Sequence, residues 1–599
     1  MADRMIAKLK VVPQQALATD PAVARYELAR IRPLARAWIT QTPEPQRRDT
    51  AALFVRRAFD RLKDLTAPDA PIHPPFAVPF GTLDAGGRSL ADALGGAAAE
   101  LPSAEAVDSL SSLYSVLLPS HDRSTLGAFY TPAALVSRLV ELAEEAQVDW
   151  TTASILDPAC GGGAFLLPVA ARIIEALPDA TPKAVLNHLG RRLKGLELDP
   201  HAAGFAQTGL DLLLAPLTQR AGVAGPRLVD VCDTLERPPK AEFDLVIGNP
   251  PYGRLRLTAE QRQRFSRSLY GHANLYGVFT DIAVQWTRPG GVIAYLTPTS
   301  VLGGQYFAAL RRLLADAAPP EAIDFVQSRR GVFEDALQET MLAVFRKGGA
   351  PEPFHVHYVT VEADGEAKLT RNGAVQLPED RDAPWLAPRV PEQSRLAQAA
   401  ARMPTRLADW GYRVSTGPLV WNRFKDQLCE RGGRDRHPLI WAEAVSANGQ
   451  FSFRAEKRNH SPWFHAGPKD GWLIVKDPCV LVQRTTAKEQ SRRLIAAELP
   501  AAFVRTHGGV VVENHLNMVR AIGRPRVSAQ LMAAVLNSAT LDQVYRCISG
   551  SVAVSAFELE SMPLPSVDQV APLADLLHQG GVTPAFEGAL ASLYAEADA

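Results

Sequence analysis

What the sequence lacks excludes several classes of protein. No apolar run is long enough to cross a bilayer, and the residues after Met1 show no charged segment followed by an apolar one, as a signal peptide would. The chain has only five cysteines in 599 residues, and they show no paired metal-ligand spacing. They are Cys160, Cys232, Cys429, Cys479 and Cys547. We therefore expect a protein of the reducing cytoplasm, with no bound metal and no membrane partner.

The chain also lacks net charge, which is unexpected for a nucleic-acid binder until the sequence is divided. Lys and Arg number 64, as do Asp and Glu. Residues 401–550, however, hold about 22 Lys and Arg against about 12 Asp and Glu, so the remainder is acidic. This asymmetry predicts a phosphate-facing surface in the C-terminal part, where aromatic and basic residues alternate over Trp421–Lys425.

Residues 248–253, Gly-Asn-Pro-Pro-Tyr-Gly, say most about chemistry. The apolar run Phe243–Ile247 predicts a buried parallel strand, so Asn249 lies where open α/β sheets bind ligands. The two prolines fix φ twice and remove two backbone donors. An amide acceptor, carbonyls and the Tyr252 ring remain, which suit a planar substrate with an amino group. The alternative for this motif alone is a proline turn after a strand.

A second motif lies about ninety residues upstream. Residues 154–166 read as a strand, an acidic corner at Asp157, a glycine loop and a helix. A glycine loop alone could bind a dinucleotide. The loop is Asp-Pro-Ala-Cys-Gly-Gly-Gly rather than a dinucleotide fingerprint, however, and Asp157 would repel a pyrophosphate while suiting an ammonium group.

Two further strands end in acidic residues. The strand from Leu193 reaches Glu197, whose carboxylate can accept both hydroxyls of a ribose, and Leu198 is placed to pack on an adenine. We expect Asp199 to cap the following helix. The strand from Leu228 ends near Asp230 and Asp233.

An amphipathic helix precedes all of these motifs, after Phe129-Tyr130-Thr131-Pro132. Thr131 is predicted as its N-cap, with Pro132 at the first helical position. The segment is either a lid on a bound cofactor or an ordinary helix start. Further short strands over 292–296, 322–325 and 340–345 alternate with helices and predict a doubly wound α/β sheet.

The order of these motifs resembles the gamma-class N6-adenine DNA methyltransferases of bacterial restriction-modification and phage-defence systems. The resemblance covers residues 120–347 motif by motif and continues loosely to about 565. It implies an S-adenosylmethionine-dependent domain and a flipped adenine in double-stranded DNA as substrate. It also implies a C-terminal α+β target-recognition domain.

The resemblance assigns roles to individual residues. The catalytic corner would be Asn249, Pro250, Pro251 and Tyr252, with Tyr252 stacking on the base. Phe333 would be a second stacking residue, although core packing is its alternative role and Phe325 or Phe345 could be mistaken for it. By family spacing, Asp233 rather than Asp230 would meet the adenine of the cofactor. The implied cofactor-binding residues are Tyr130, Thr131, Asp157, Ala159, Gly161, Glu197, Leu198, Asp233 and Asn249.

The expected organisation has five parts. They are a helical N-terminal extension (1–115), a catalytic domain (116–347), a linker rich in Pro, Gly and charge (348–388), a DNA target-recognition domain (389–570) and a C-terminal tail (571–599). The stretches Pro68–Pro79 and Gly86–Gly96 are expected to interrupt the helices of the extension. The DNA-binding candidates are Arg423, Lys425, Arg484 and Lys488.

Two alternatives remain. One is methylation of another amino group, on RNA bases or on a protein glutamine amide. The other is a modification subunit that needs a specificity partner. The sequence shows no nuclease cluster and no helicase P-loop, so a cognate restriction endonuclease would be a separate protein.

Overall fold

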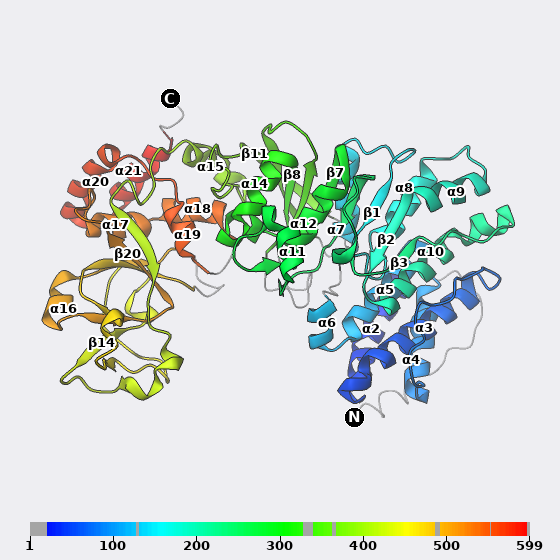
Figure 1. The fold of residues 1–599 in the computed structure, drawn as a ribbon, viewed down its shortest axis with the longest axis horizontal. Helices are drawn as coiled ribbons and strands as arrows, with labels where there is room; N and C mark the ends of the chain where they lie inside the picture. The colour runs from blue at the N-terminus through cyan, green and yellow to red at the C-terminus, as the bar shows by residue number, and fades with distance from the viewer. Residues whose placement is uncertain are drawn as a thin grey trace. The chain divides into compact units, whose positions relative to one another are not determined.

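The structure, a computed structural model, describes residues 21–126, 131–326, 339–361, 367–485, 492–550 and 553–595 (Figure 1). The chain forms two compact units. Unit 1 comprises residues 1–297, 313–352 and 359–369, and unit 2 comprises residues 298–312, 353–358 and 370–599. Within the described ranges, no helix is both long and apolar enough to cross a membrane.

The N-terminal extension is helical, as the sequence predicts. Its helices are α2 (Pro21–Ile39), α3 (Arg47–Thr66), α4 (Ala85–Ala98), α5 (Ser103–Leu117) and α6 (Ser120–Leu126). The prediction that the glycine-rich stretch interrupts these helices is wrong, because the stretch lies inside α4. A Cβ atom at Gly87 would lie 2.3 Å from the Trp38 ring, and one at Gly95 would lie 2.3 Å from the Ala58 carbonyl oxygen. The glycines therefore let α4 approach α2 and α3 closely.

A nine-stranded sheet forms the centre of the catalytic region, in the order β11-β10-β8-β9-β7-β4-β1-β2-β3. Its strands are β1 (Ile155–Asp157), β2 (Leu193–Glu197), β3 (Val229–Val231), β4 (Phe243–Gly248), β7 (Thr287–Pro298), β8 (Pro320–Val326), β9 (Thr340–Arg346), β10 (Phe354–Val361) and β11 (Ala367–Val375). Strands β3, β2, β1, β4 and β7 are parallel, and β9 is antiparallel to β8. The predicted doubly wound α/β fold is confirmed.

Helices connect the parallel strands and continue the fold. They include α7 (Ala133–Glu145), α8 (Leu166–Glu175), α9 (Pro182–Arg192), α10 (Pro200–Ala221), α12 (Leu275–Trp286) and α14 (Ala308–Ala317). From β1 the chain progresses through β2 to β3, and then returns to β4 on the other side of β1. The switch point between β1 and β4 is where an open α/β sheet binds its ligand.

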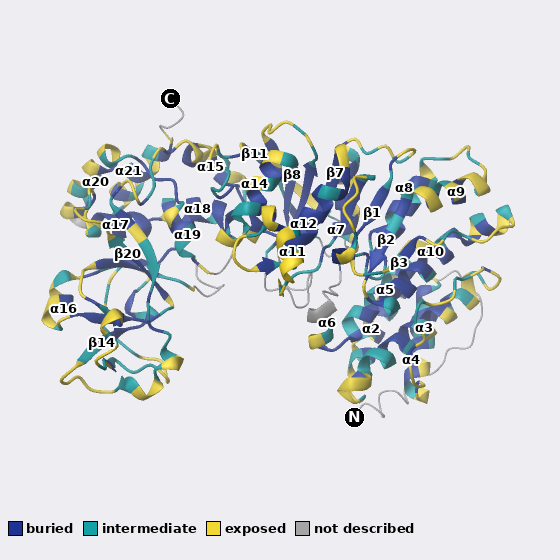
Figure 2. Cartoon of the chain, in the orientation of Figure 1, coloured by how far each residue is buried: buried dark blue, intermediate teal, exposed yellow. Residues whose placement is uncertain are grey.

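The N-terminal helices and the sheet share one hydrophobic core, which is the dark blue interior of this region in Figure 2. The Phe59 and Phe205 rings stack with centroids 5.9 Å apart and join α3 to α10. A Cβ atom at Gly209 would lie 2.3 Å from the Val107 side chain, so α5 approaches the backbone of α10 directly. The extension is therefore an integral layer of unit 1.

The segment predicted as a linker, residues 348–388, differs from that prediction. It contains β10 and β11, which form one edge of the nine-stranded sheet. Phe354, Val356 and Val359 in β10 are buried. The segment was predicted to be a linker because Pro, Gly and charged residues are frequent around these strands and in β11. This composition hid the apolar positions of β10, which mark it as a strand.

Unit 2 combines two small sheets with helices, as the predicted α+β domain requires. The first sheet is β12 (Tyr412–Thr416), β20 (Leu516–Ala521), β17 (Cys479–Gln483) and β18 (Ala496–Leu499). The second is β13 (Leu428–Cys429), β15 (Trp463–His465), β14 (Arg436–Ile440), β19 (Val510–Val512) and β16 (Ile474–Val475). The helices are α15 (Ser394–Ala401), α16 (Ala501–Thr506), α17 (Ala529–Leu536), α18 (Ala539–Ile548), α19 (Ala556–Glu560), α20 (Val567–Gly580) and α21 (Pro584–Ala595). The expected tail beyond residue 570 thus holds packed helices, with Leu573, Phe586 and Tyr594 in the core.

A buried ion pair ties α7 to β8. Arg138 Nε donates to Asp324 Oδ2 at 2.7 Å, and the two side chains are 3% and 0% exposed. We expect Arg138→Met to lower the free energy of unfolding by about 3–5 kcal/mol, because a buried carboxylate loses its guanidinium. The control, Arg57→Met, breaks an exposed pair with Asp92 and should cost less than about 1 kcal/mol. Equal effects in urea unfolding would contradict the burial argument.

Candidate cofactor and catalytic site

The glycine loop after β1 is held by its own backbone and by Glu197. The Cys160 N–H donates to the Leu196 carbonyl at 2.9 Å, which fixes the loop beside β2. Gly161 and Gly163 have φ of +52° and +93°, a conformation that favours glycine. The Gly161 N–H donates to Glu197 Oε2 at 2.9 Å. The loop is thus preorganised around an acidic side chain from the next strand.

Glu197 ends β2 and accepts a second bond at Oε1, from the Asp199 N–H at 2.8 Å. Burial raises the pKa of Glu197 to about 7, although both backbone donors act to lower it. Each carboxylate oxygen can accept more than one hydrogen bond. Glu197 can therefore receive ribose hydroxyls while it holds the loop.

Asp157 ends β1 and is 1% exposed. Its Oδ1 accepts from the Ala159 N–H at 3.1 Å, and burial raises its pKa to about 8. A Cβ atom at Gly248 would lie 2.7 Å from Asp157 Oδ1, so only glycine lets the end of β4 come so close to this carboxyl group. The ends of β1 and β4 therefore bring Asp157 against Gly248, one residue before Asn249.

Asn249 is held by Thr131. The Asn249 Nδ2 donates to Thr131 Oγ1 at 3.0 Å, while Asn249 Oδ1 is buried and has no hydrogen-bond partner in the described part of the chain. The prediction that Thr131 caps α7 is wrong: Pro132 is the N-cap residue, and no side chain caps this helix. The extended conformation of Pro132 starts the helix one residue later, and the Thr131 hydroxyl is engaged by Asn249 instead.

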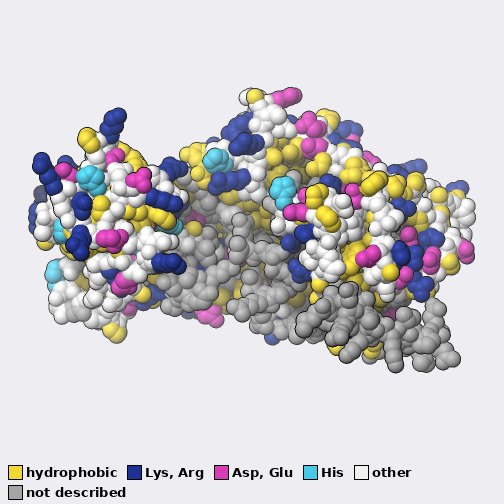
Figure 3. Space-filling model, turned by 90° about the horizontal axis from the view of Figure 1, so that it is seen from below, with side chains coloured by type: hydrophobic (Ala, Val, Ile, Leu, Met, Phe, Trp, Pro, Cys, Tyr) yellow, Lys and Arg dark blue, Asp and Glu magenta, His cyan; other side chains and the backbone are white. Residues whose placement is uncertain are grey.

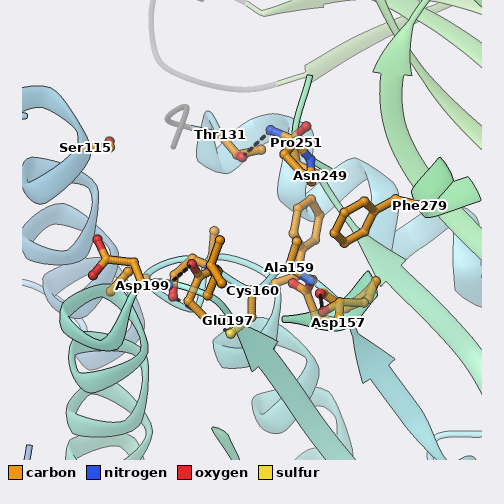
Figure 4. Close-up of a pocket in the computed structure, with 18 of the residues that line it drawn as sticks. Ser115, Thr131, Asp157, Ala159, Cys160, Glu197, Asp199, Asn249, Pro251 and Phe279 are labelled. Carbon is orange, nitrogen blue, oxygen red and sulfur yellow. Dashed lines mark hydrogen bonds between the residues drawn. The ribbon is translucent and has the colours of Figure 1, made fainter. Parts of the chain in front are cut away.

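One cavity connects these groups (Figure 4). Among the predicted residues, its walls contain Thr131, Asp157, Ala159, Gly161, Glu197, Leu198, Asp233, Asn249 and Pro251. Pro250 and Tyr252 do not line it; the Tyr252 hydroxyl donates to the Leu296 carbonyl at 3.2 Å. Tyr130, Phe333 and Lys488 lie outside the described residues.

The two acidic candidates after β3 have different surroundings. Asp233 lines the cavity and accepts from the Leu235 N–H at 2.9 Å. Asp230 is absent from the wall and pairs with Lys194 and Arg237, at 2.7 and 3.1 Å. Asp233 thus lines the cavity, whereas Asp230 does not.

The charge of the cavity identifies the kind of ligand that it suits. Among the residues that the structure describes, its lining includes five carboxylic acid side chains and no Lys or Arg. The five are Asp108, Asp157, Glu197, Asp199 and Asp233. Such a wall disfavours a pyrophosphate and favours a cation. S-adenosylmethionine, which carries a sulfonium and an ammonium group, fits these residues.

The sequence interpretation missed the contribution of the N-terminal extension. Asp108, Ser111, Tyr114 and Ser115 of α5 all line the cavity. Burial raises the pKa of Asp108 to about 6. Their spacing of three to four residues, which puts them on neighbouring positions of one helix face, was the available signal. The cap predicted for Asp199 is confirmed, since its Oδ1 accepts from the His201 N–H at 3.0 Å.

The DNA-binding candidates belong to unit 2. Arg423 and Lys425 are exposed, and Lys425 Nζ lies 5.8 Å from the centroid of the Trp421 ring. Arg484 is half-buried, and its Nη1 donates to the Asn514 carbonyl at 3.2 Å. Figure 3 shows Lys and Arg side chains on this part of the surface, interspersed with acidic ones.

Known proteins resemble this chain over most of its length. The family description Eco57I restriction-modification methylase matches residues 230–333. Type II methyltransferase M.BsuBI of Bacillus subtilis is 26% identical over 461 residues, which cover 75% of this chain and 89% of that relative. Type II methyltransferase M.PstI of Providencia stuartii is 27% identical over 354 residues, which cover 57% of this chain and 68% of that relative.

A solved structure, that of the Type IIL restriction-modification enzyme MmeI in complex with DNA, aligns with 99% of this chain and 95% of its own, with 14% identity and a TM-score of 0.49. The family match covers residues 230–333, and these residues include the Asn-Pro-Pro-Tyr corner at 249–252. The chain is therefore similar to the gamma-class methyltransferases of restriction-modification systems, which use S-adenosylmethionine.

Proposed function

We propose that this protein methylates the N6 amino group of an adenine extruded from double-stranded DNA at a specific sequence. Asn249 Oδ1 supports this most directly, because it is a buried acceptor at the cavity with no hydrogen-bond partner in the described ranges. A buried polar atom left unsatisfied costs about 1–3 kcal/mol. The amino group of a base in the cavity would supply the missing donor.

The orientation of the Asn249 amide explains how the chain would activate the substrate. Thr131 engages Nδ2, so Oδ1 is the atom available to the incoming amino group. The exocyclic nitrogen of adenine is a poor nucleophile, because its lone pair is delocalised into the ring. Hydrogen bonds donated by this amino group to Asn249 Oδ1 and to the Pro250 carbonyl would increase the sp3 character of the nitrogen and localise its lone pair. Catalysis would then come from positioning and preorganised acceptors.

The other side of the cavity carries the groups that would bind the cofactor. When bound, S-adenosylmethionine supplies an activated methyl group on a sulfonium. Glu197 would hold the ribose hydroxyls, and Asp157 the ammonium group. Leu198 and Asp233 would hold the adenine ring, since both line the wall beyond Glu197.

The extruded base needs an apolar wall next to Asn249. Phe279 and Leu275 of α12 line the cavity together with Leu255. Tyr252, which packs edge-on against Tyr276 with centroids 6.1 Å apart, is our candidate for stacking on the base. We also propose Phe333 as a second stacking residue. Stacking on aromatic rings tolerates any base, so selection of adenine would come from the acceptors.

We assign chemistry to residues 116–347 and sequence recognition to residues 389–570. The basic excess of residues 401–550 supports this division. All five cysteines are free thiols, which suits the reducing cytoplasm. A cognate restriction endonuclease would be a separate protein. Methylation of RNA or of a glutamine amide is the competing activity, and the product distinguishes it.

The test of the proposal is the modified nucleoside. Incubation of the protein with duplex DNA and labelled S-adenosylmethionine should yield N6-methyladenine, identified by mass spectrometry after digestion to nucleosides. Asn249→Ala should abolish transfer but leave cofactor binding within about twofold, because it removes the acceptor and leaves the glycine loop intact. Methylcytosine or methylglutamine as product, or a near-normal rate for Asn249→Ala, would refute the mechanism.

Thr131 should act through Asn249, and a graded series checks this. Thr131→Val removes the hydroxyl but keeps the shape, and we expect the maximal rate to fall about 2- to 10-fold, as for one neutral hydrogen bond. Thr131→Ser restores the hydroxyl and should recover most of the rate. A Thr131→Ser enzyme as slow as Thr131→Val would show that the methyl group matters instead.

Cofactor binding should release protons. With a pKa of about 8, Asp157 is mostly protonated at pH 7 in the free protein, and a nearby ammonium group favours its ionised form. Affinity should therefore rise from pH 6 to 7.5. Calorimetry at pH 7 in buffers of different ionisation enthalpy should detect the release, and Asp157→Asn should diminish it. Asp230→Asn, an acid outside the cavity, is the control; no release from the wild type would contradict the assignment.

Arg423 and Arg484 should contribute differently to DNA binding. Arg484 is held by the Asn514 carbonyl, as a base-reading side chain requires, whereas exposed Arg423 suits a phosphate. Arg484→Ala should cost about 1–3 kcal/mol and relax specificity at one position. Arg423→Ala should weaken all sequences alike and reduce the salt slope by about one. Arg395→Ala, an exposed cation on α15, is the control, and equal effects of all three would refute the assignment.

A further inference from the structure

Helix α5 forms one side of the cofactor cavity, although it belongs to the N-terminal extension. Asp108, Ser111 and Ser115 of this helix line the cavity. Figure 4 shows Ser115 on its helix at one side of the cavity. These residues precede the methyltransferase motifs in the sequence. Their position in the cavity therefore calls for a role that the motifs do not provide.

Ser111 is the residue of this wall whose bonding is incomplete. Its side chain is 7% exposed, and its Oγ is buried without a hydrogen-bond partner among the described residues. The neighbouring hydroxyls differ: Ser112 Oγ donates to the Ser109 carbonyl at 3.1 Å, and Ser115 Oγ donates to the Ser112 carbonyl at 2.8 Å. Because Ser111 lines the cavity, its unsatisfied hydroxyl is a candidate donor to a ligand bound there.

The glycine loop brings Ser111 to the cofactor. A Cβ atom at Gly162 would lie 2.9 Å from Ser111 Cβ, so α5 approaches the loop as closely as glycine allows. This loop follows β1, between the Asn249 end of β4 and the Glu197 end of β2. A cofactor that extends from Asn249 to Glu197 must cross the loop, and its oxygens come within reach of α5.

The helix is fixed at the turn that carries Glu197. The Tyr114 hydroxyl donates to Asp199 Oδ2 at 2.8 Å, and Arg48 Nη2 of α3 donates to Asp199 Oδ1 at 3.1 Å. The Asp199 N–H in turn donates to Glu197 Oε1. Ser111 is thereby held in register with the ribose-binding carboxylate.

We propose that α5 belongs to the cofactor site and that the Ser111 hydroxyl donates a hydrogen bond to an oxygen of bound S-adenosylmethionine. The inference rests on the proposed function, since it takes this molecule as the cofactor. Two oxygens share the required chemistry: the carboxylate of the amino-acid end and a ribose hydroxyl. The N-terminal extension thus supplies a ligand to the active centre.

The test is calorimetric titration of the full-length protein with S-adenosylmethionine. Ser111→Ala should raise the dissociation constant about 3- to 30-fold, the range for loss of one neutral or charge-assisted hydrogen bond. In methylation assays the KM for the cofactor should rise similarly, with kcat within about twofold. Ser109→Ala, on the same helix but outside the cavity wall, is the matched control and should bind as the wild type does.

Titration with 5′-methylthioadenosine identifies the oxygen. This probe keeps the ribose and lacks the amino-acid end. Weakened binding of the cofactor alone assigns the bond to the carboxylate, and weakened binding of both ligands assigns it to the ribose. Equal dissociation constants for Ser111→Ala, Ser109→Ala and the wild type would overturn the inference. Failure of the wild type to bind the cofactor would instead refute the proposed function.

Discussion

The site depends on one pairing in the sheet. Strands β1 and β4 are parallel neighbours, with Leu156 opposite Val246. The carboxyl ends of the two strands therefore lie at the same edge of the sheet. Gly248 has no side chain, and the Asp157 carboxyl group can therefore lie against the end of β4. The groups for the cofactor and those for the substrate are consequently set by backbone hydrogen bonds. A rigid strand end holds a functional group more accurately than a loop, which is what transfer between two bound molecules requires.

The N-terminal extension stabilises this edge from outside. It shares the hydrophobic core of the sheet through contacts such as Phe59 with Phe205, and it reaches the cavity through α5. Asp199 is the junction: it begins α10 and accepts bonds from two helices of the extension. One acidic side chain thus has a local role, as a helix cap, and a tertiary role, as an anchor. The turn between β2 and α10 is therefore constrained on both sides.

The sequence predicted strands β1, β2, β3 and β4, because each is a short apolar run with a candidate functional residue at or just after its end. It predicted that Asp199 caps a helix, since this rests on neighbours in the chain. It did not reveal that Thr131 bonds Asn249, because the two are 118 residues apart and only the folded sheet brings them together. The prediction that the glycines of α4 interrupt a helix was wrong for a related reason, because their contacts are with residues distant in the sequence. Gly87 and Gly95 act as helix breakers in isolation, but here they provide close contact with Trp38 and Ala58. The only sequence signal for Ser111 was its helical spacing from Asp108 and Ser115. Its place in the cavity depends on the close approach of α5 to Gly162, which the sequence does not show.

The acidic side chains in the cavity wall also bear on what happens after methyl transfer. The wall favours a ligand that carries a sulfonium charge, because its described residues include five acidic side chains and no Lys or Arg. Loss of the methyl group converts the sulfonium into a neutral thioether. The demethylated product therefore retains the shape of the cofactor but loses one attractive charge, and the same wall holds it less strongly. The electrostatics of the wall therefore favour exchange of spent cofactor for fresh cofactor.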